Sequence, residues 1–346
     1  MEQRRSGRQK CSKGGEKLIR ISQLKLPITH TKAQLEKKIA KTLKNPGNSF
    51  TYEIKKQSLD CRHKNDKIFV YTVDVTIRDE QKLAKKVNNN NIMLTKERPY
   101  EFPSPGETPL LHSPVIVGSG PAGLFCGWYL AKAGYCPIIL ERGEEAEKRQ
   151  KTVENFWKNG VLDPESNVQF GEGGAGTFSD GKLNTLVKDP YGRNHEVLKR
   201  FVAAGAPEEI IYQQKPHLGT DVLVGIVEKM RHEIEEMGGK FCFRSKVTDL
   251  IFENSTLKEI EINNDKRIPA QVCVLAPGHS ARDTFEMLQK RGVYMEPKSF
   301  AVGLRIEHPQ EMINMDLYGE PENELLGAAS YKVTHKCANG RGVYSF

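Results

Sequence analysis

The chain has 346 residues, of which 38% are hydrophobic and 28% charged, a balance typical of a globular protein with two or three domains. No apolar run approaches the roughly 20 residues needed to cross a bilayer, and the basic start MEQRRSGRQKCSKGGEKL lacks the apolar stretch of a secretory signal. Seven cysteines without a CxxC pair argue against a disulfide framework, a zinc site and a disulfide reductase. We therefore expect a cytoplasmic protein without a transmembrane segment and without a metal site.

The net charge of +8 is unevenly distributed along the chain. Residues 1–100 hold 24 Lys and Arg against 10 Asp and Glu, a net charge of +14, and the remainder holds 28 against 34, a net charge of −6. Such a basic module indicates either attraction to an anionic partner such as nucleic acid or a solvated lysine-rich surface. Stacking aromatic residues are not interleaved with the lysines, which favours the solvated surface.

The first hundred residues predict a small α+β domain over residues 17–95. Residues 1–16 carry almost nothing to bury and are predicted to form a disordered basic tail. The order of the elements after the tail is β-α-β-β-α, which is typical of a ferredoxin-like domain. The predicted elements are a strand over 18–26, a helix over 33–43, strands over 50–54 and 68–77, and a helix over 80–87. The proline-rich stretch that follows predicts a linker over residues 96–113.

The strongest signal is a strand, a glycine turn, a helix and a second strand within residues 114–141. The apolar run PVIV leads into GSGPAG, and the pattern LFCGWYLAKAGY leads into the strand CPIIL. Gly118 permits the tight turn, Gly120 lets the main chain approach a pyrophosphate, and Gly123 lets the helix pack on the strand. The helix N-terminus offers free N–H groups to phosphates, and Glu141 is placed to accept hydrogen bonds from the adenosine ribose hydroxyls.

A second glycine-rich segment, NVQFGEGGAGTFSDGKLNT, spans residues 167–185. Its spacing also matches GxGxxG, but no buried strand precedes it and no helical apolar stripe follows, so we do not expect a separate NADPH site. We predict a loop whose successive amides form a concave donor surface for the ring or the pyrophosphate of a bound cofactor, with Lys182 or Asp180 near the reactive edge. A tight surface loop without a ligand is the alternative.

The rest of the chain predicts an open α/β sheet. The expected elements are a helix over 221–237, a β-meander of strands over 240–244, 247–252 and 257–262, and the apolar strand AQVCVL. That strand ends in the small-residue turn APGH, which lets main chain pass close to a ligand at the carboxyl edge of the sheet. The predicted fold class is α/β, with a Rossmann-type parallel sheet and a β-meander after the small domain.

Several long motifs together resemble one family. They are GSGPAG with ERG, FGEGGAGTFSDGKL, KPHLGTD, APGHSARDTFEML and KSFAVGLRIEHPQ, and the resemblance covers residues 17–346. With these motifs the chain resembles the uncharacterised bacterial FAD-dependent, or NAD(FAD)-utilising, dehydrogenases, which are relatives of the glutathione-reductase-like flavoproteins. Proteins of that family continue beyond GVYSF to a later Gly-Asp turn, so the resemblance implies a chain truncated at its C-terminus.

The resemblance implies FAD as the cofactor. It assigns the FAD-binding domain to residues 114–292 and part of a substrate or cap domain to residues 293–346. The implied FAD contacts are Gly118, Gly120, Pro121, Ala122, Gly123, Glu141, Arg142, Gly173, Gly174, Ala175, Gly176, Thr177, Lys182, Val247, Ala276 and Gly278.

The expected activity is that of an FAD-dependent oxidoreductase, which passes a hydride through flavin N5 to or from an unidentified small molecule. Lys182, Arg305 and His308 are the predicted catalytic residues, the last two in a predicted strand. The sequence contains no second βαβ unit for a nicotinamide, so NAD(P)H is expected to visit the flavin only transiently. The alternative function is an RNA-modifying flavoprotein that binds nucleic acid through its basic N-terminal domain.

Overall fold

The computed structural model describes residues 17–345 apart from 45–48, 79, 88, 97–98, 179–180, 182 and 184–186. The predicted tail, Asp180 and Lys182 therefore lie outside the described residues. The chain divides into two units, which are described separately below. The first unit takes in residues 1–99, 212–214 and 300–346, and the second takes in residues 100–211 and 215–299.

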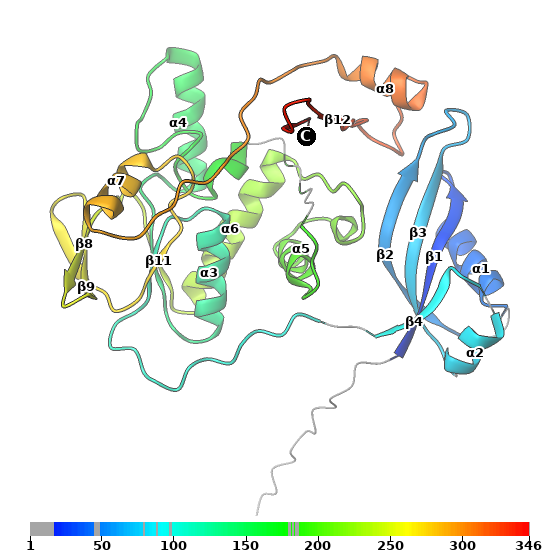
Figure 1. The fold of residues 1–346 in the computed structure, drawn as a ribbon, viewed down its shortest axis with the longest axis horizontal. Helices are drawn as coiled ribbons and strands as arrows, with labels where there is room; N and C mark the ends of the chain where they lie inside the picture. The colour runs from blue at the N-terminus through cyan, green and yellow to red at the C-terminus, as the bar shows by residue number, and fades with distance from the viewer. Residues whose placement is uncertain are drawn as a thin grey trace, which may run out of the picture. The chain divides into compact units, whose positions relative to one another are not determined.

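The first unit contains the small N-terminal domain (Figure 1). Its elements are β1 (Lys17–Pro27), α1 (Lys32–Thr42), β2 (Thr51–Asp60), β3 (Ile68–Thr76), α2 (Glu80–Val87) and β4 (Ile92–Lys96). The strands form one sheet in the order β2-β3-β1-β4 with every neighbouring pair antiparallel, the ferredoxin-like arrangement predicted from the sequence. Strand β4 was not predicted, because its five residues directly follow a run of asparagines.

The core of this domain forms because β1 and β3 are central strands and α1 covers them. Ile19 and Val73 are fully buried there, together with Ile39 of α1. The helix begins with a capping box, in which the Thr31 hydroxyl accepts from the Gln34 amide and the Gln34 side chain accepts from the Thr31 amide. Both helices pack on the same face of the sheet (Figure 1).

Part of the chain beyond residue 300 packs on the turn between β2 and β3. Helix α8 (Gln310–Tyr318) receives a hydrogen bond of 3.3 Å from Lys64 Nζ to the Met315 carbonyl. Lys67 Nζ lies 2.7 Å from Glu320 Oε1, just after the helix. Residues 300–346, predicted to belong to a separate substrate domain, are thus grouped with the N-terminal domain, and they end in the hairpin β12 (Thr334–Lys336) and β13 (Gly342–Tyr344).

The strand predicted around Arg305 and His308 is wrong, because residues 299–309 form neither helix nor strand. The apolar side chains of this extended segment alternate along the chain, but they are not buried. Val302, Leu304 and Ile306 are 85%, 95% and 72% exposed. A period-2 pattern predicts a strand only where a partner strand is present to pair with it.

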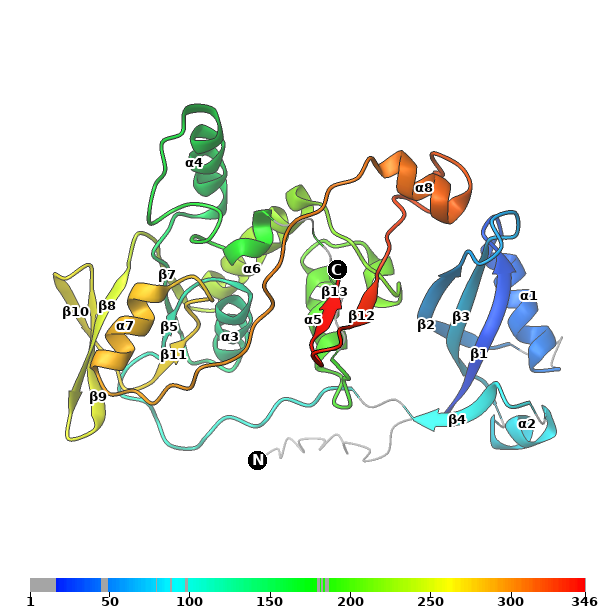
Figure 2. The same cartoon turned by 45° about the horizontal axis from the view of Figure 1, so that its top comes forward.

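The second unit is a parallel sheet between two layers (Figure 2). Its elements are β5 (Val115–Val117), α3 (Pro121–Lys132), β6 (Ile138–Leu140), α4 (Ala146–Asn159), the 3₁₀ helix η1 (Gly174–Phe178), α5 (Arg193–Ala203), the 3₁₀ helix η2 (Glu208–Ile211), α6 (Thr220–Glu236), β7 (Lys240–Cys242), β8 (Val247–Glu253), β9 (Thr256–Ile262), β10 (Lys266–Pro269), β11 (Cys273–Leu275) and α7 (Arg282–Lys290). The sheet order is β11-β5-β6-β7, all parallel, so the predicted β5-α3-β6 unit is confirmed.

The two faces of the sheet have separate cores because successive residues of a strand point to opposite faces. Ile116 packs with Trp128 of α3 and Met230 of α6. Val115 and its second neighbour Val117 pack instead with the meander and α7. Helices α3 and α6 therefore cover one face of the sheet, and the meander together with α7 covers the other.

The predicted composition of the meander was wrong in one strand. Strand β7 follows helix α6 and pairs in parallel with β6, whereas the meander consists of β8, β9 and the unpredicted β10. A strand of three residues, KFC, is too short for its pattern to tell the two sheets apart. Within the described ranges, no helix is long and apolar enough to span a bilayer.

Candidate functional site

The turn after β5 presents main-chain amides without acceptors. Gly120 is the N-cap of α3, and the first intrahelical hydrogen bond runs from the Leu124 amide to the Gly120 carbonyl at 2.9 Å. The amides of Gly120, Ala122 and Gly123 therefore have no acceptor among the described residues, and Pro121 has no amide hydrogen. Helix termini of this kind concentrate partial positive charge and bind phosphate groups.

Two glycines of the turn are required by close main-chain contacts. A Cβ atom on Gly118, whose φ is +98°, would lie 2.3 Å from the Ala276 carbonyl oxygen. A Cβ atom on Gly123 would lie 1.9 Å from the Gly118 carbonyl oxygen. The Ala276 amide also donates to the Val117 carbonyl at 2.9 Å. The structure thus brings the glycine turn and the turn after β11 together at the carboxyl edge of the sheet.

Gly120 differs from these two glycines. A Cβ atom there would meet only Gly174 Cα, at 3.8 Å, and its φ of −66° suits any residue. The fold of the turn would therefore accept a side chain at position 120. It leaves open space beside the three amides without acceptors, and this arrangement fits the approach of a diphosphate.

The second glycine-rich segment uses its first amides internally. The Gly171 amide donates to Glu141 Oε1 at 3.0 Å, and the Gly173 amide donates to the Ser119 carbonyl at 3.0 Å. The intervening Glu172 amide donates to the Glu144 carbonyl, also at 3.0 Å. The predicted concave donor surface is therefore wrong for residues 171–173, because their hydrogens are already bound by protein acceptors.

The carbonyl groups of the same segment surround Arg149 of α4. This side chain is fully buried, and desolvation lowers the pKa of its guanidinium to about 10. Sequence analysis did not identify it, because an arginine within EKRQK has the appearance of a solvated helix face. Its Nε donates to Asn167 O at 2.9 Å. The acceptors around Nη1 are Gly171 O at 3.3 Å, Glu172 O at 2.7 Å, Gly174 O at 2.7 Å and Thr177 Oγ1 at 2.8 Å.

One nitrogen of the Arg149 guanidinium lacks a hydrogen-bond acceptor. Its Nη2 atom is buried and has no acceptor among the described residues. Because this nitrogen is shielded from solvent, a ligand atom could contact it only if the surrounding segment moved. Arg149 therefore fits a role in holding the segment better than direct contact with a cofactor.

Glu141, at the end of β6, is buried with only 4% of its surface exposed. Its Oε2 accepts from the amide and the hydroxyl of Ser119, at 2.9 and 2.8 Å. Its Oε1 accepts from the Gly143 and Gly171 amides, at 2.9 and 3.0 Å. These four donors tie the carboxylate to the glycine turn, to the residues after β6 and to the second glycine-rich segment, and its contact with a ribose stays a prediction.

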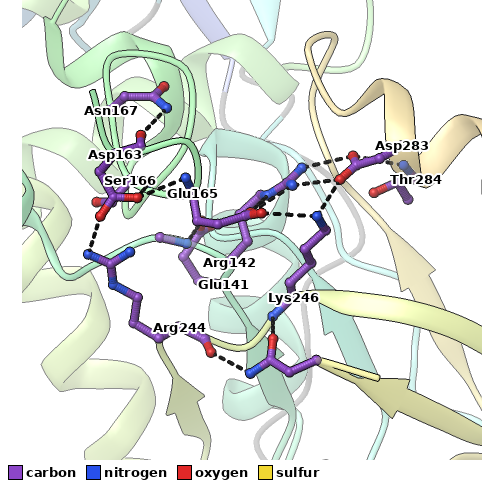
Figure 3. Close-up of polar contacts among 12 residues, drawn as sticks. Glu141, Arg142, Asp163, Glu165, Ser166, Asn167, Arg244, Lys246, Asp283 and Thr284 are labelled. Carbon is purple, nitrogen blue, oxygen red and sulfur yellow. Dashed lines mark hydrogen bonds and ion pairs between the residues drawn. The ribbon is translucent and has the colours of Figure 1, made fainter. Parts of the chain in front are cut away.

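Arg142 lies in a network of ion pairs at the same edge of the sheet (Figure 3). Its guanidinium donates to Glu165 at 2.7 Å and to both oxygens of Asp283 at 3.0 and 2.7 Å, and it lies over the Phe170 ring. Lys246 Nζ pairs with the same two carboxylates, at 3.0 and 2.7 Å. Hydrogen bonds from Arg142 hold the pKa of the Asp283 carboxyl well below its usual range, against the effect of burial and with help from Lys246.

The network continues through Arg244, just beyond β7 (Figure 3). Its Nη2 lies 2.8 Å from Glu144 Oε1 and 2.7 Å from Asp163 Oδ2. Asp163 Oδ1 in turn accepts from the Glu165 and Ser166 amides, at 2.9 and 3.0 Å. The loop around Asp163 is therefore tied to the ends of both β6 and β7.

The structure locates the other predicted site residues as follows. Lys182 lies outside the described residues. Val247 begins β8 with its side chain buried in the meander core. Arg305 and His308 belong to the first unit, where Arg305 is exposed and His308 Nε2 lies 2.9 Å from the Tyr331 hydroxyl. Among the described side chains, no group of three or more His, Cys, Asp or Glu could hold a metal ion.

Three family models match separate parts of the chain. Residues 116–151 match the NAD(P)-binding Rossmann-like domain, which contains the glycine turn. Residues 299–346 match the model described as FAD-dependent protein, C-terminal domain-like. Residues 18–76, most of the ferredoxin-like domain, match the Domain of unknown function (DUF8436).

One curated relative is an uncharacterized protein of Clostridium beijerinckii, 45% identical over 331 residues. The alignment covers 95% of this chain and 62% of the relative, so the chain spans less than two thirds of that protein's length.

Two solved structures show partial similarity. THI4 of Thermovibrio ammonificans has 21% identity and a TM-score of 0.35, with 52% of this chain and 62% of that chain covered. Thioredoxin reductase of Lactococcus lactis has 16% identity and a TM-score of 0.26, with 47% and 34% covered. The family matches confirm the recognition made from the motifs: the chain is similar to FAD-dependent proteins that carry a Rossmann-like dinucleotide-binding domain, and FAD is the cofactor they support.

Proposed function

We propose that the second unit binds FAD through the glycine turn, as the cofactor-binding part of an FAD-dependent oxidoreductase. The single observation that carries this proposal is the set of three amides without acceptors, on Gly120, Ala122 and Gly123. The first amides of a helix have no acceptor within the helix, and where a glycine leaves room beside them, as Gly120 does here, they favour an anionic ligand. The diphosphate of FAD carries the charge that this terminus attracts.

In this proposal each glycine of the turn has a different task. Gly118 and Gly123 allow the turn to close against Ala276 and against itself, and Gly120 leaves room for the diphosphate. When bound, FAD would supply the redox chemistry, a hydride transfer at N5 to or from a small molecule, with NAD(P)H as a transient donor. The protein's own contribution is to hold the cofactor in one orientation and to place its amides where phosphate charge must be balanced.

The test compares two glycine-to-aspartate variants of the whole chain. Gly120→Asp puts a carboxylate beside the three amides without a clash, because a Cβ atom there meets only an ordinary contact. Gly225→Asp is the matched control: it lies on the exposed surface of α6, where a Cβ atom meets nothing within 4 Å. We expect all three proteins to have the same circular dichroism and unfolding temperature.

The visible absorption spectrum after incubation with FAD and gel filtration provides the readout. The parent and Gly225→Asp should carry the bands of oxidised flavin, and Gly120→Asp should lose at least about 90% of them, since like charge opposes the diphosphate. A Gly120→Asp protein that keeps its flavin would refute the assignment of the turn. A parent that takes up no FAD would refute the cofactor itself.

The electron donor is tested separately on flavin-loaded protein without oxygen. Addition of NADH or NADPH should bleach the flavin bands if either nicotinamide is the donor. Bands that persist with both would remove the nicotinamide from the proposal and leave FAD binding intact.

A further inference from the structure

A groove of about 1000 Å³ runs between helix α1 and strand β2 of the first unit. The residues of α1 that line it recur every three or four positions, so they lie along one flank of the helix. This wall carries the lysines of the groove, which are Lys37, Lys41 and Lys44. Phe50 and Tyr52 line the opposite wall, where they are half-buried against the core of the domain. The groove therefore has one cationic wall and one apolar wall.

The cationic wall lacks counter-charges. All three lysines are exposed, and none of them forms an ion pair with another described residue. Glu36 is the other charged residue of the lining, so the groove has an excess of positive charge. Burial, together with the charge of Glu36, raises the pKa of Tyr52, and the hydroxyl of this tyrosine stays protonated. The groove is thus complementary in charge to an anionic ligand.

The apolar wall belongs to an edge strand, because β2 is the outermost strand of its sheet. Among the described residues, the main chain of residues 51–56 forms hydrogen bonds only with β3. Further along the strand, the Gln57 amide donates to the Tyr212 carbonyl at 2.8 Å, and the Gln214 amide donates to the Gln57 carbonyl at 3.0 Å. This edge therefore already accepts an extended segment of the same unit beyond the groove. Beside the groove, its main chain offers the same kind of pairing.

We propose that the groove between α1 and β2 is a docking site for an extended acidic peptide segment of a partner protein. The peptide adds a strand beside residues 51–56, places alternate apolar side chains against the two aromatic rings, and pairs its carboxylates with the lysines. A nucleic acid would supply anionic groups but no peptide groups for the strand edge. The rings of Phe50 and Tyr52 are tilted by 50° and pack on the core, so they do not form parallel platforms for stacked bases.

The experiment measures the binding of a model peptide to the whole chain. The probe is a fluorescein-labelled peptide of alternating glutamate and valine, about ten residues long and blocked at both ends, which matches the length of a strand. Fluorescence anisotropy gives its dissociation constant. The variant is Lys41→Glu in the wall of the groove, and Lys38→Glu is the matched control, because Lys38 is an exposed lysine of the same helix outside the lining.

The two charge reversals should have different effects on binding. Lys41→Glu should weaken the peptide by at least about fivefold, because it places like charge beside the carboxylates. Lys38→Glu should change the dissociation constant by less than about twofold, since this side chain lies outside the groove. Equal losses for the two variants would overturn the proposal, because the peptide would then respond only to the total charge of the domain.

Strand addition is tested with a second peptide of the same length and charge, in which proline replaces each valine. It should bind at least about tenfold more weakly, because proline has no amide hydrogen and does not fit a paired strand. Amide hydrogen exchange of residues 51–56 should become slower when the glutamate–valine peptide binds. Equal affinities for the two peptides, or unchanged exchange in β2, would show that the ligand does not pair with the strand and would refute the proposal.

A labelled oligouridylate of about ten nucleotides tests the other class of anionic partner at the same salt concentration. It should bind more weakly than the glutamate–valine peptide. Tighter binding of the oligouridylate, weakened by Lys41→Glu and not by Lys38→Glu, would make the groove a nucleic-acid site and overturn the proposal. A parent that leaves the peptide unbound up to about 1 mM would also refute it, and neither result depends on whether the second unit binds FAD.

Discussion

Two adjacent cations of α4 illustrate how much depends on the direction of one side chain. Arg149 is fully buried among main-chain carbonyls, whereas its neighbour Lys148 is exposed and pairs with Glu145. Both belong to the same polar stretch of sequence, so composition gives no means of telling them apart. Only the loop that folds back over α4 decides which of the two is enclosed.

Replacement of Arg149 by methionine should cost about 3–5 kcal/mol of unfolding free energy, because several buried carbonyls and two nearby carboxylates would lose their cation. Urea unfolding followed by tryptophan fluorescence gives this value. Lys148→Met is the matched control and should leave the unfolding midpoint unchanged. Equal midpoints for the two variants would contradict the role of Arg149 as an internal tie.

At the scale of elements, the ion-pair network joins the loop after β6 to the N-terminus of α7 and the start of β8. Asp283 accepts from Arg142 and from Lys246, and its pKa lies below the ordinary value of 3.8. At pH values between the lowered native pKa of Asp283 and 3.8, the native state therefore binds fewer protons than the unfolded state. The resulting stabilisation is complete above about pH 5 and is lost as the pH falls through 3.8 toward the lower native pKa.

Asp283→Asn should accordingly lower the unfolding free energy by about 1 kcal/mol at neutral pH, a small value because the side chain is 42% exposed. The difference from the parent should shrink as the pH falls from about 5 to 2. Urea midpoints measured across this range test the prediction. Asp265→Asn, in an exposed turn, should show no such dependence, and a constant difference for Asp283→Asn would contradict the assigned cause.

The elements that could be predicted are those whose pattern is local. The β5-α3-β6 unit follows from an apolar run, a glycine turn and a helix in about 30 consecutive residues. By contrast, β7 was assigned to the wrong sheet, because its pairing with β6 depends on the path of α6 and not on its own three residues. The glycine turn of the site was predictable for the same reason. By contrast, three of the four hydrogen bonds of Glu141, and those of the Arg149 guanidinium, involve residues 18 to 30 positions away.

At the scale of the whole chain, the first unit joins its two most distant stretches. Lys67 lies in the turn after β2, and its partner Glu320 is 253 residues further along the sequence. No local pattern could predict this pairing. Residues 300–346, which match the FAD-dependent C-terminal domain, belong to the same unit as the ferredoxin-like domain.

Glu320→Gln should loosen α8 without unfolding the sheet. Amide hydrogen exchange in α8 is expected to become faster, by less than about tenfold because the ion pair is partly exposed to solvent. Exchange in β1 and β3 should not change. Glu322→Gln, two residues away and exposed, is the control, and equal exchange rates in the two variants would contradict a tie through Lys67.

The extended segment that contains Val302, Leu304 and Ile306 has a consequence for the protein in solution. Side chains at every second position of an extended chain point the same way, so these three form an apolar row beside main chain that belongs to no sheet. A row of this kind is a template on which another polypeptide can add a strand, and repeated addition leads to aggregation. This polypeptide should therefore aggregate faster as its concentration rises.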